Sequence, residues 1–434
     1  MKKVSILFTF CIVFSLNIIA NEVIKITWAG GGGIQKLFVI TATYNKDYTI
    51  DWGDGTVETK KGTGGEQIIT YYYDSFDSFQ VTIAGNSTDC LFTGLGCGGN
   101  RVSDLDLSKC TALTFLSCKM NQLSALDVSN CTALKELTCF DNRLSSLDLS
   151  ANTALTHVWC FENRLSSLDV SGCTALIQLS CSDNQLSNLD LSANIVLETL
   201  GCANNRLSSL DFGNNLHLTG FACENNQITN LDLSSNPLID RVDCYNNRLP
   251  LSDLYKISKK ISDPFYRFLG TQTLTVQTIL PGSSVDFSEQ AEFDGIATVF
   301  EVQKDGFPAT IDVDYTITAG IITFNHDGNY TVTMTNSAIV ANAYYPAKVI
   351  AAFIVGEVGI TDVNQVPEVL IYPNPTTNVV YIKAEKELIP EVKLYSTDGR
   401  LLQVVRSVEI DLSGYAAGVY YLRVEEKIMK LIKK

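Results

Sequence analysis

The middle third of the chain repeats one pattern of hydrophobic and polar residues every 21 positions. Each repeat carries a cysteine, an asparagine three residues later, an aliphatic residue five later and an aspartate nine later. Because apolar residues alternate in Leu137-Thr138-Cys139, we predict a short strand there, with Leu137 and Cys139 pointing inward while Thr138 and Phe140 face solvent. The repeated cysteines are Cys97, Cys118, Cys139, Cys160, Cys181, Cys202, Cys223 and Cys244.

A 21-residue unit cannot bury its own apolar edge, so the repeats are expected to stack and to join these edges into one core. Parallel strands about 4.8 Å apart would give a solenoid roughly 40 Å long over eight coils. After the last repeat, Leu254, Ile257 and Ile261 have helical spacing. We therefore predict a helix within residues 251–262 that covers the open end of the solenoid.

The repeated cysteine and asparagine allow a structural and a functional interpretation. The asparagine follows the strand, where its amide can satisfy backbone groups of the bend and of the next coil. We favour the cysteines as buried thiols over a metal or redox function, because side chains stacked in parallel register make poor disulfides. A second interior column is predicted to hold cysteine or asparagine interchangeably, at Cys110, Cys131, Asn152, Cys173, Asn194, Asn215 and Asn236.

A column of aspartates on neighbouring coils is unfavourable, because like charges that close together repel one another. Calcium could relieve the repulsion, or each carboxylate could cap backbone amides near the following serine while solvent screens the rest. We favour capping, because no repeat has the multi-oxygen loop of a dedicated calcium site. We accordingly predict no metal and no cofactor. The column comprises Asp106, Asp127, Asp148, Asp169, Asp190, Asp211, Asp232 and Asp253.

Over residues 91–254 the unit Leu-x-x-Leu-x-Cys-x-x-Asn-x-Leu-x-x-Leu-Asp-Leu-Ser-x-Asn/Cys keeps its register through eight copies. This pattern resembles the leucine-rich repeat family, in the short bacterial form with cysteine at one leucine position. The resemblance implies a solenoid domain that, with its helical cap, spans residues 91–262. The fold class predicted for the chain is mainly β, a leucine-rich-repeat solenoid of short parallel strands flanked by immunoglobulin-like β-sandwich domains.

Both flanks of the repeats are rich in strand-forming residues. Residues 22–89 contain Asp-Trp-Gly-Asp-Gly at 51–55 and three tyrosines at 71–73, and they resemble the PKD-like immunoglobulin-type fold. There we expect the Gly-Asp-Gly to form a hairpin turn and Trp52 to anchor the core, and we favour structural roles for its aspartates over metal binding. Residues 264–358 are predicted as a second immunoglobulin-like β-sandwich, because they return to an alternating pattern.

The two ends of the chain resemble targeting segments. Two lysines, a mostly apolar stretch and Ala20 predict an export signal peptide over residues 1–20, and no later segment reaches the roughly 20 apolar residues that span a bilayer. Residues 366–434 resemble the C-terminal sorting domain of type IX secretion cargo. The matching motifs are Tyr-Pro-Asn-Pro at 372–375, Tyr-Ser-Thr-Asp-Gly-Arg at 395–400 and Gly-Tyr-Ala-Ala-Gly-Val-Tyr-Tyr-Leu-Arg-Val at 414–424, followed by a basic end.

That second resemblance implies passage across the outer membrane by the type IX secretion machinery and removal of the sorting domain. The mature protein would then be secreted or held at the cell surface. The formal net charge of −15 becomes −17 if the signal peptide is removed, since the peptide carries two positive charges and no negative ones. This acidity disfavours nucleic acid and anionic membrane as partners.

Length and motifs bear on the class of protein. With 434 residues, the chain is too long for one compact core and predicts two to four domains. Its histidines, His157, His217 and His326, belong to no recognisable nucleophile or metal motif, and phosphate-binding and zinc motifs are missing from the sequence. A pair of carboxylates distant in sequence remains open, but we predict that the protein is not an enzyme.

A binding site is best sought at outward strand positions that differ between repeats. Large aromatic side chains on a rigid sheet can stack on a sugar ring or anchor a protein interface, although aromatic residues also favour strands for structural reasons. Recognition of an extracellular protein, as in adhesion, is the predicted function. The alternatives are a glycan-binding accessory module that uses Trp159 as a platform and a structural cell-envelope component. The candidate ligand-binding residues are Phe115, Phe140, His157, Trp159, Phe161 and Tyr245.

Overall fold

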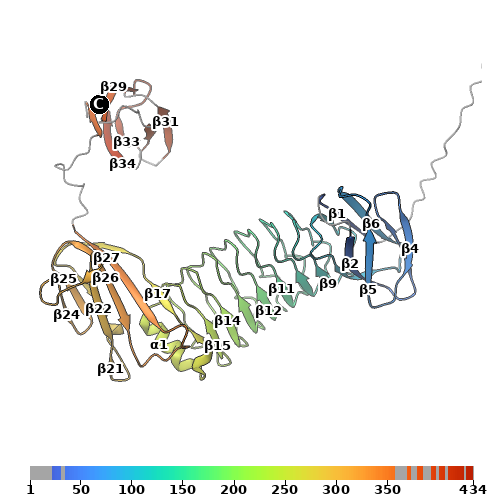
Figure 1. Ribbon diagram of the computed structural model, residues 1–434, viewed down its shortest axis with the longest axis horizontal. Helices are drawn as coiled ribbons and strands as arrows, with labels where there is room; N and C mark the ends of the chain where they lie inside the picture. The colour runs from blue at the N-terminus through green and yellow to red at the C-terminus, as the bar shows by residue number, and fades with distance from the viewer. Residues whose placement is uncertain are drawn as a thin grey trace, which may run out of the picture. The chain divides into compact units, whose positions relative to one another are not determined.

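The computed structural model describes residues 22–30 and 35–356 and, nearer the C-terminus, residues 369–372, 379–384, 392–396, 400–405, 409–424 and 427–433. The chain divides into two compact units between Val355 and Gly356. The described elements are almost all β-strands (Figure 1). No helix among these residues is long and apolar enough to cross a membrane. The predicted signal peptide lies outside the described residues.

The first unit begins with strands β1 (Val23–Trp28), β2 (Gln35–Ala42), β3 (Asp47–Asp51), β4 (Val57–Lys61), β5 (Glu66–Tyr72), β6 (Phe79–Gly85), β7 (Phe92–Gly96) and β8 (Val102–Asp106). They form one sheet of order β4-β3-β6-β1-β8 and the start of another, β5-β2-β7. Trp28, Phe38 and Trp52 are fully buried, and the ring centroids of Phe38 and Trp52 lie 5.8 Å apart. Trp52 therefore anchors this core, as predicted.

The predicted turn after Trp52 is also confirmed. Gly53 and Gly55 have φ angles of +79° and +94° in the hairpin that joins β3 to β4. A Cβ atom at Gly53 would lie 2.4 Å from the Gln80 carbonyl oxygen, so both the backbone angle and the close approach require glycine.

The solenoid consists of short parallel strands, one for each coil (Figure 1). Consecutive strands pair with an offset of 21 residues, as in Leu137 with Val158 and Val158 with Leu179. We number the coils one to eight by their cysteines, from Cys97 to Cys244. The strands of coils two to eight are β9 (Phe115–Ser117), β10 (Glu136–Thr138), β11 (His157–Trp159), β12 (Gln178–Ser180), β13 (Thr199–Gly201), β14 (Gly220–Ala222) and β15 (Arg241–Asp243).

The interior matches the predicted alternation. Leu137 and Cys139 are fully buried while Thr138 and Phe140 are only half-buried, and the same pattern recurs along the ladder. All twelve cysteines in the described part of the chain are buried free thiols. In the second column, the buried Asn152 amide donates to the carbonyl oxygens of Val128 and Cys131, each at 2.9 Å. Cysteine and asparagine thus do replace one another in one buried interior column, as predicted.

The asparagine after each strand ties its coil to the coil before it. The Asn142 amide nitrogen donates to the Cys118 and Cys139 carbonyl oxygens at 3.0 Å, and its oxygen accepts from the Leu123 amide at 3.0 Å. Comparable bonds occur at Asn121, Asn163, Asn184, Asn205, Asn226 and Asn247. The structural interpretation of this column is confirmed.

The first coil is continuous with the N-terminal sheets. Strand β7 pairs in parallel with β9 of the solenoid and antiparallel with β2, and β8 pairs antiparallel with β1. The N-terminal region (residues 22–89) and the solenoid, which the sequence analysis divides near residue 90, therefore share strands in both N-terminal sheets. The physical reason is that the first coil would otherwise expose an unpaired strand edge.

The other end of the solenoid is closed by helix α1 (Leu251–Lys260), which buries Leu251, Leu254 and Ile257, as predicted. The segment η1 (Pro264–Tyr266) and strand β16 (Arg267–Phe268) then add a further rung next to β15. Gln272 continues the asparagine column, because its amide nitrogen donates to the Cys244 carbonyl oxygen at 3.0 Å.

The remainder of the first unit is a β-structure that shares one hydrophobic core with the solenoid. Its larger sheet has the order β17-β27-β26-β22-β23, with β18 also paired to β27, and a three-stranded sheet has the order β19-β25-β24. The elements are β17 (Thr271–Thr273), β18 (Gln277–Ile279), β19 (Ser284–Asp286), η2 (Ser288–Gln290), β20 (Glu292–Phe293), β21 (Ile296–Ala297), β22 (Val299–Lys304), β23 (Phe307–Pro308), β24 (Tyr315–Thr318), β25 (Ile321–Phe324), β26 (Gly328–Thr335) and β27 (Lys348–Val355).

The second unit is also β-sheet, with sheets of order β28-β29-β32 and β31-β30-β33-β34. Leu394, Ile410 and Leu422 belong to its separate buried core. Residues 373–375 of the Tyr-Pro-Asn-Pro motif and residues 397–399 of the Tyr-Ser-Thr-Asp-Gly-Arg motif lie outside the described residues. The strands are β28 (Val369–Tyr372), β29 (Val379–Ala384), β30 (Val392–Tyr395), β31 (Leu401–Val405), β32 (Glu409–Asp411), β33 (Gly418–Val424) and β34 (Lys427–Lys433).

Candidate functional site

The solvent-facing side of the parallel ladder, which we call the strand face, carries two aromatic clusters. The first comprises Phe140, His157, Trp159 and Phe161 on coils three and four, and we call it the aromatic patch. The Phe140 and Phe161 rings stack with centroids 4.2 Å apart, and the His157 and Trp159 rings stack at 5.4 Å. Each of the four side chains is half-buried.

This stacking follows from the 21-residue offset of the ladder. Phe140 and Phe161 occupy the same position on adjacent coils, so their rings lie one above the other. Lys119, at that position on coil two, places its Nζ atom 5.5 Å from the centroid of the Phe140 ring. The patch is therefore a preorganised block of rings with a cation at one end.

Two of the six candidate residues lie apart from this patch. Phe115 lies on coil two, in register with Glu136 on coil three and His157 on coil four. Glu136 therefore separates it from His157. Tyr245 lies on coil eight, four coils from Phe161, and contacts Tyr345 with ring centroids 4.7 Å apart. The six candidates therefore do not form a single site.

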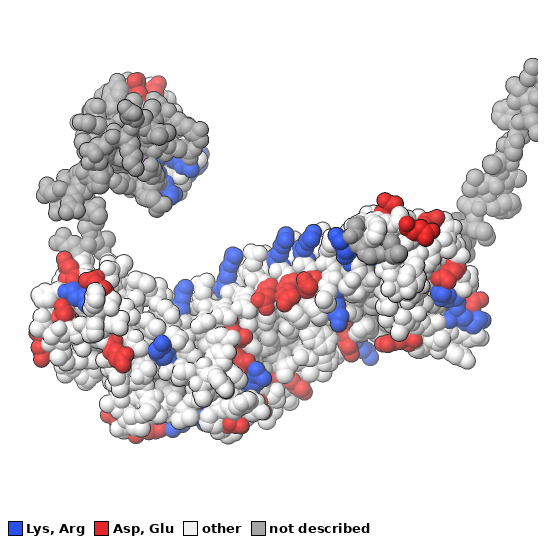
Figure 2. Space-filling model, in the orientation of Figure 1, with Lys and Arg blue, Asp and Glu red and all other residues white. Residues whose placement is uncertain are grey.

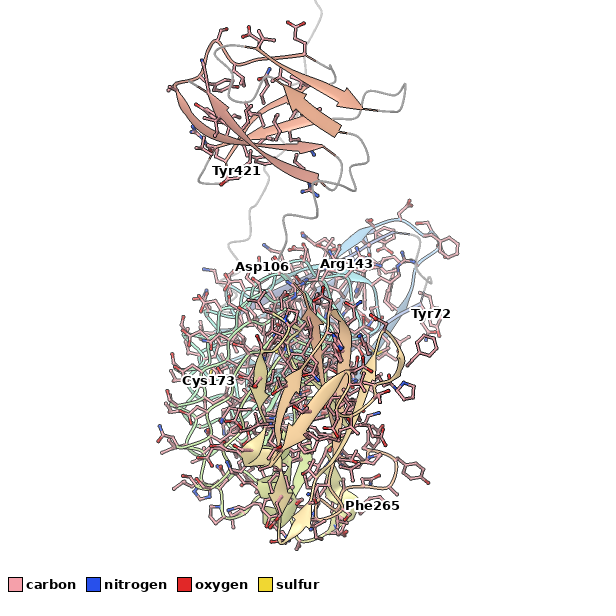
Figure 3. All side chains as sticks on the ribbon, turned by 90° about the vertical axis from the view of Figure 1, so that its left-hand side faces the viewer. Tyr72, Asp106, Arg143, Cys173, Phe265 and Tyr421 are labelled. Atoms are coloured by element: carbon pink, nitrogen blue, oxygen red, sulfur yellow. The ribbon has the colours of Figure 1, made fainter. Side chains whose placement is uncertain are left out.

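Tyr245 belongs instead to a second cluster, the C-terminal cluster, with Phe265, Phe268 and Tyr345. The Phe268 and Tyr345 centroids lie 5.3 Å apart, and the Arg241 guanidinium lies 5.3 Å from the Phe268 centroid while pairing with Asp243 at 2.8 Å. Phe265 is 61% exposed and lies at the periphery of the unit (Figure 3). Sequence reasoning missed this cluster, because nothing in the sequence places residue 345 beside residue 245.

Between the two clusters, the strand face is lined mainly by small side chains. The positions equivalent to Trp159 on coils five, six and seven are Ser180, Gly201 and Ala222. At the edge of this stretch, burial raises the pKa of the Glu224 carboxyl above its usual range, and its Oε2 atom has no hydrogen-bond partner within the described chain. The strand face thus carries the aromatic patch at one end, the C-terminal cluster at the other, and mainly small side chains on coils five to seven between them.

The cysteine column offers no reactive group at neutral pH. Burial raises the pKa of the Cys97 and Cys160 thiols to about 12 and that of Cys139 well above its usual range. Since the thiolate is the nucleophile and the metal ligand, these thiols pack as apolar groups.

The aspartate column caps the backbone, as favoured from sequence. The Asp190 carboxylate accepts from the Ser192 amide at 2.9 Å, and the amide and hydroxyl of that serine lower the pKa of Asp190. The Ser108 side chain and amide, together with Lys25, lower the pKa of Asp106 to about 2. Asp253 departs from the predicted column, because helix α1 turns it inward, where it accepts from the Leu231 amide at 3.2 Å.

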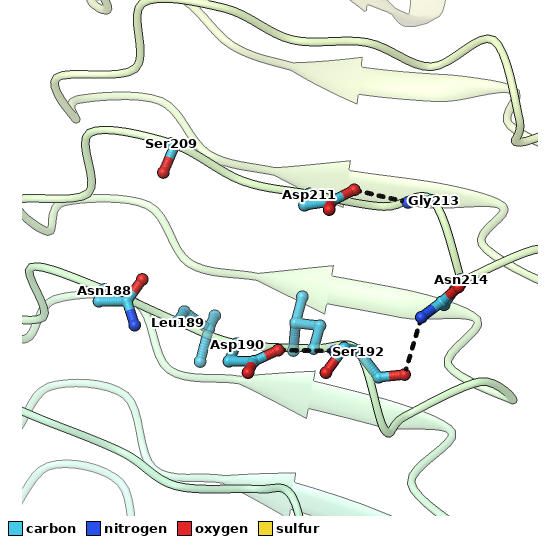
Figure 4. A pocket seen from close by; sticks show the side chains of 9 residues that line it. Asn188, Leu189, Asp190, Ser192, Ser209, Asp211, Gly213 and Asn214 are labelled. Carbon is cyan, nitrogen blue, oxygen red and sulfur yellow. Dashed lines mark hydrogen bonds between the residues drawn. The ribbon is translucent and has the colours of Figure 1, made fainter.

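A pocket of about 260 Å³ lies beside the aspartate column, between coils five and six. Figure 4 shows Asp190 and Asp211 on its two sides, and each carboxylate accepts a hydrogen bond from a backbone amide of its own coil. The Asn214 side-chain amide donates to the Ser192 carbonyl oxygen of the preceding coil. Nowhere in the described ranges do three or more histidine, cysteine, aspartate or glutamate side chains gather as metal ligands.

Comparison with known families identifies the C-terminal end. Residues 370–434 match the secretion system C-terminal sorting domain. The protein is accordingly type IX secretion cargo that is secreted or displayed at the cell surface, and its sorting domain engages the secretion machinery. The fold and this match together define a secreted or surface protein with a β-solenoid of stacked 21-residue coils.

Solved structures with a similar fold come from Listeria monocytogenes. The functional domain of InlJ, which includes a cysteine ladder, is 22% identical with a TM-score of 0.39, and the match covers 61% of this chain and 67% of that one. Internalin C2 is 21% identical with a TM-score of 0.35, over 37% of this chain and 78% of that one. At these values the likeness carries nothing about ligand or activity. The comparison with curated proteins finds no match.

Proposed function

We propose that the protein acts outside the cell by binding an extracellular protein through the strand face of its solenoid, with the aromatic patch as the anchor. The observation that carries this proposal is the pair of ring stacks, Phe140 on Phe161 and His157 on Trp159, on a rigid ladder. Large rings whose positions are fixed before binding lose little conformational entropy on contact, and aromatic residues are enriched among interface hot spots.

The repeat itself supports this assignment. Inward positions are conserved in type from coil to coil because the core requires them, whereas outward strand positions vary without cost to stacking. Aromatic residues concentrate at these variable positions on coils three and four, while coils five to seven carry no aromatic residue there. Half-buried rings are also large enough to exclude water from a contact.

A glycan is the second candidate ligand, and one feature favours it. Trp159 lies between Thr138 and Ser180 on the adjacent rungs. Small hydroxyl side chains on both sides suit a sugar ring stacked on the indole, with its hydroxyls bonded at the edges. We rank this second, because the Trp159 ring already stacks on His157 and because the neighbouring pair of phenylalanines adds apolar area.

Replacing Trp159 and Phe161 by alanine should weaken partner binding at least about thirtyfold, the loss typical of removing a hot spot. The mature protein would be immobilised and screened in parallel against an extracellular-protein array and a glycan array, followed by titration of each hit. Tyr72→Ala is the matched control, because Tyr72 is an exposed aromatic residue, 62% accessible, in the N-terminal sheets.

A protein hit that the double variant loses and the Tyr72 variant keeps supports the proposal. If only glycans bind, and Trp159→Ala abolishes that binding, the second candidate replaces the first. Hits in neither array would contradict both candidates and favour a structural role in the cell envelope.

A further inference from the structure

The residue four positions after each repeated cysteine forms a row of long basic or amide side chains along one edge of the solenoid. Six of the eight side chains are exposed and two are half-buried. Figure 2 shows basic side chains projecting in file from the upper edge of the solenoid. In coil order, the row consists of Arg101, Gln122, Arg143, Arg164, Gln185, Arg206, Gln227 and Arg248.

Stacking of the coils does not require arginine in this row. Backbone hydrogen bonds join the coils at this position. The Arg143 amide donates to the Leu123 carbonyl oxygen at 2.9 Å, and the Gln185 amide donates to the equivalent Leu165 carbonyl oxygen at 2.8 Å. Glutamine therefore serves equally well on three coils. In the described part of the chain, no carboxylate lies within ion-pair distance of Arg143, Arg164 or Arg248.

The choice of residue is nevertheless selective. Five of the ten arginines in the chain occupy this one repeat position, whereas none of the 22 lysines does. Coils lie about 4.8 Å apart, so the neighbouring guanidinium groups of Arg143 and Arg164 repel each other unless an anion lies between them. Arginine differs from lysine in presenting a planar fork of donors that matches carboxylate and sulfate or phosphate groups in pairs.

The surroundings restrict the shape of such an anion. Two residues before the row, coils three to five carry Asp141, Glu162 and Asp183, and five residues after it runs the aspartate column. The positive strip is therefore one side chain wide. A nucleic acid duplex is too broad for it, and a single nucleic acid strand would find no aromatic platform within the row, because all eight positions are arginine or glutamine.

We propose that this arginine row binds a linear polysaccharide bearing carboxylate or sulfate groups. The row runs over seven coil spacings, about 34 Å, and so engages several charged sugars at once. The serines two positions after the arginines, such as Ser145, Ser166 and Ser208, supply hydroxyl groups beside the strip. The row shares no residue with the aromatic patch, and the inference does not depend on the proposed function.

The triple variant Arg143→Gln, Arg164→Gln and Arg206→Gln tests the proposal with a residue that the row already contains, so the fold is preserved. The mature protein would be titrated at low salt with size-fractionated oligouronate, dextran sulfate and neutral dextran. We expect at least about a tenfold loss of affinity for the charged polymers, since three charge-assisted contacts are removed. Affinity should rise with polymer length and fall with added salt.

The control variant Lys109→Gln, Lys135→Gln and Lys348→Gln removes the same charge elsewhere and should stay within about twofold of the parent. The reverse variant Gln122→Arg, Gln185→Arg and Gln227→Arg completes the row and should bind more tightly than the parent. Trp159→Ala should leave this binding unchanged, which separates the result from that of the aromatic patch.

Three outcomes would overturn the proposal. The first is the absence of binding to both charged polymers at low salt. The second is an equal loss in the lysine control, which would indicate net charge alone. The third is tighter binding of single-stranded nucleic acid or polyglutamate than of either polysaccharide, which would assign the row to another class of ligand.

Discussion

Replacing Asn184 by alanine should lower the free energy of unfolding of the solenoid by about 3 kcal/mol or more. The Asn184 amide nitrogen donates to the carbonyl oxygens of Cys160, Cys181 and Ser182, each at 3.1 Å, and its oxygen accepts from the Leu165 amide at 2.9 Å. Alanine would leave several buried backbone groups without partners, and each such group costs about 1–3 kcal/mol.

Denaturant unfolding followed by circular dichroism measures this loss. Asn188→Ala is the matched control, because Asn188 is an exposed asparagine of the same coil, and it should change the stability by less than about 0.5 kcal/mol. Equal stabilities of the two variants would contradict the role assigned to the asparagine column.

Alkaline pH should unfold the protein steeply between about pH 9 and pH 11. Burial raises the pKa of Cys97 and Cys160 to about 12, and it raises the pKa values of the other repeated cysteines in the same direction. An unfolded thiol has a pKa of about 8.5. The folded state therefore holds protons that the unfolded state releases, so stability is fully present below about pH 8.5 and is lost as the pH rises towards 12.

The size of the effect comes from the number of thiols. Each contributes about 1.4 kcal/mol per pH unit within this window, so eight together contribute roughly 10 kcal/mol per unit, comparable with the whole stability of a typical domain. Stability would be measured by denaturant titration at fixed pH values with a reducing agent present. The variant Cys181→Ala and Cys202→Ala should show a slope reduced by about a sixth, because burial raises the pKa of all twelve described thiols and the variant removes two of them. An unchanged slope would mean that the thiols do not control alkaline unfolding.

The sequence predicted the solenoid because its period, its inward residues and its bends all repeat. Leu137 and Cys139 point inward, the asparagines join neighbouring coils, and the aspartates cap the backbone. Each of these contacts links residues of one coil or of adjacent coils, so the pattern of a single repeat suffices to infer them.

Features at the two ends of the solenoid could not be predicted in this way. Asp253 follows the repeat spacing but lies in helix α1, because Pro250 ends the last coil and the helix begins directly after it. The pairing of β7 with β2 and the contact of Tyr245 with Tyr345 join segments far apart in sequence. Such contacts depend on tertiary packing, which local patterns do not encode.

The candidate site was predicted in part. The ladder brings Phe140 to Phe161 and His157 to Trp159, as the common period implies. Glu136 separates Phe115 from His157, and Tyr245 lies four coils from Phe161 and contacts Tyr345 instead, because outward position alone does not make residues neighbours. Whether these side chains contact a ligand stays a prediction.

The 21-residue coils stack so that eight cysteines line the interior of the solenoid as free thiols. Alkylation with iodoacetamide at pH 7.5, followed by peptide mass spectrometry, tests it directly. We predict that the native protein leaves the cysteines from Cys97 to Cys244 in this column unmodified over hours, and that all eight react once guanidinium unfolds the chain without a reductant. Rapid alkylation of several of them in the native protein, or a need for reductant after unfolding, would contradict the account.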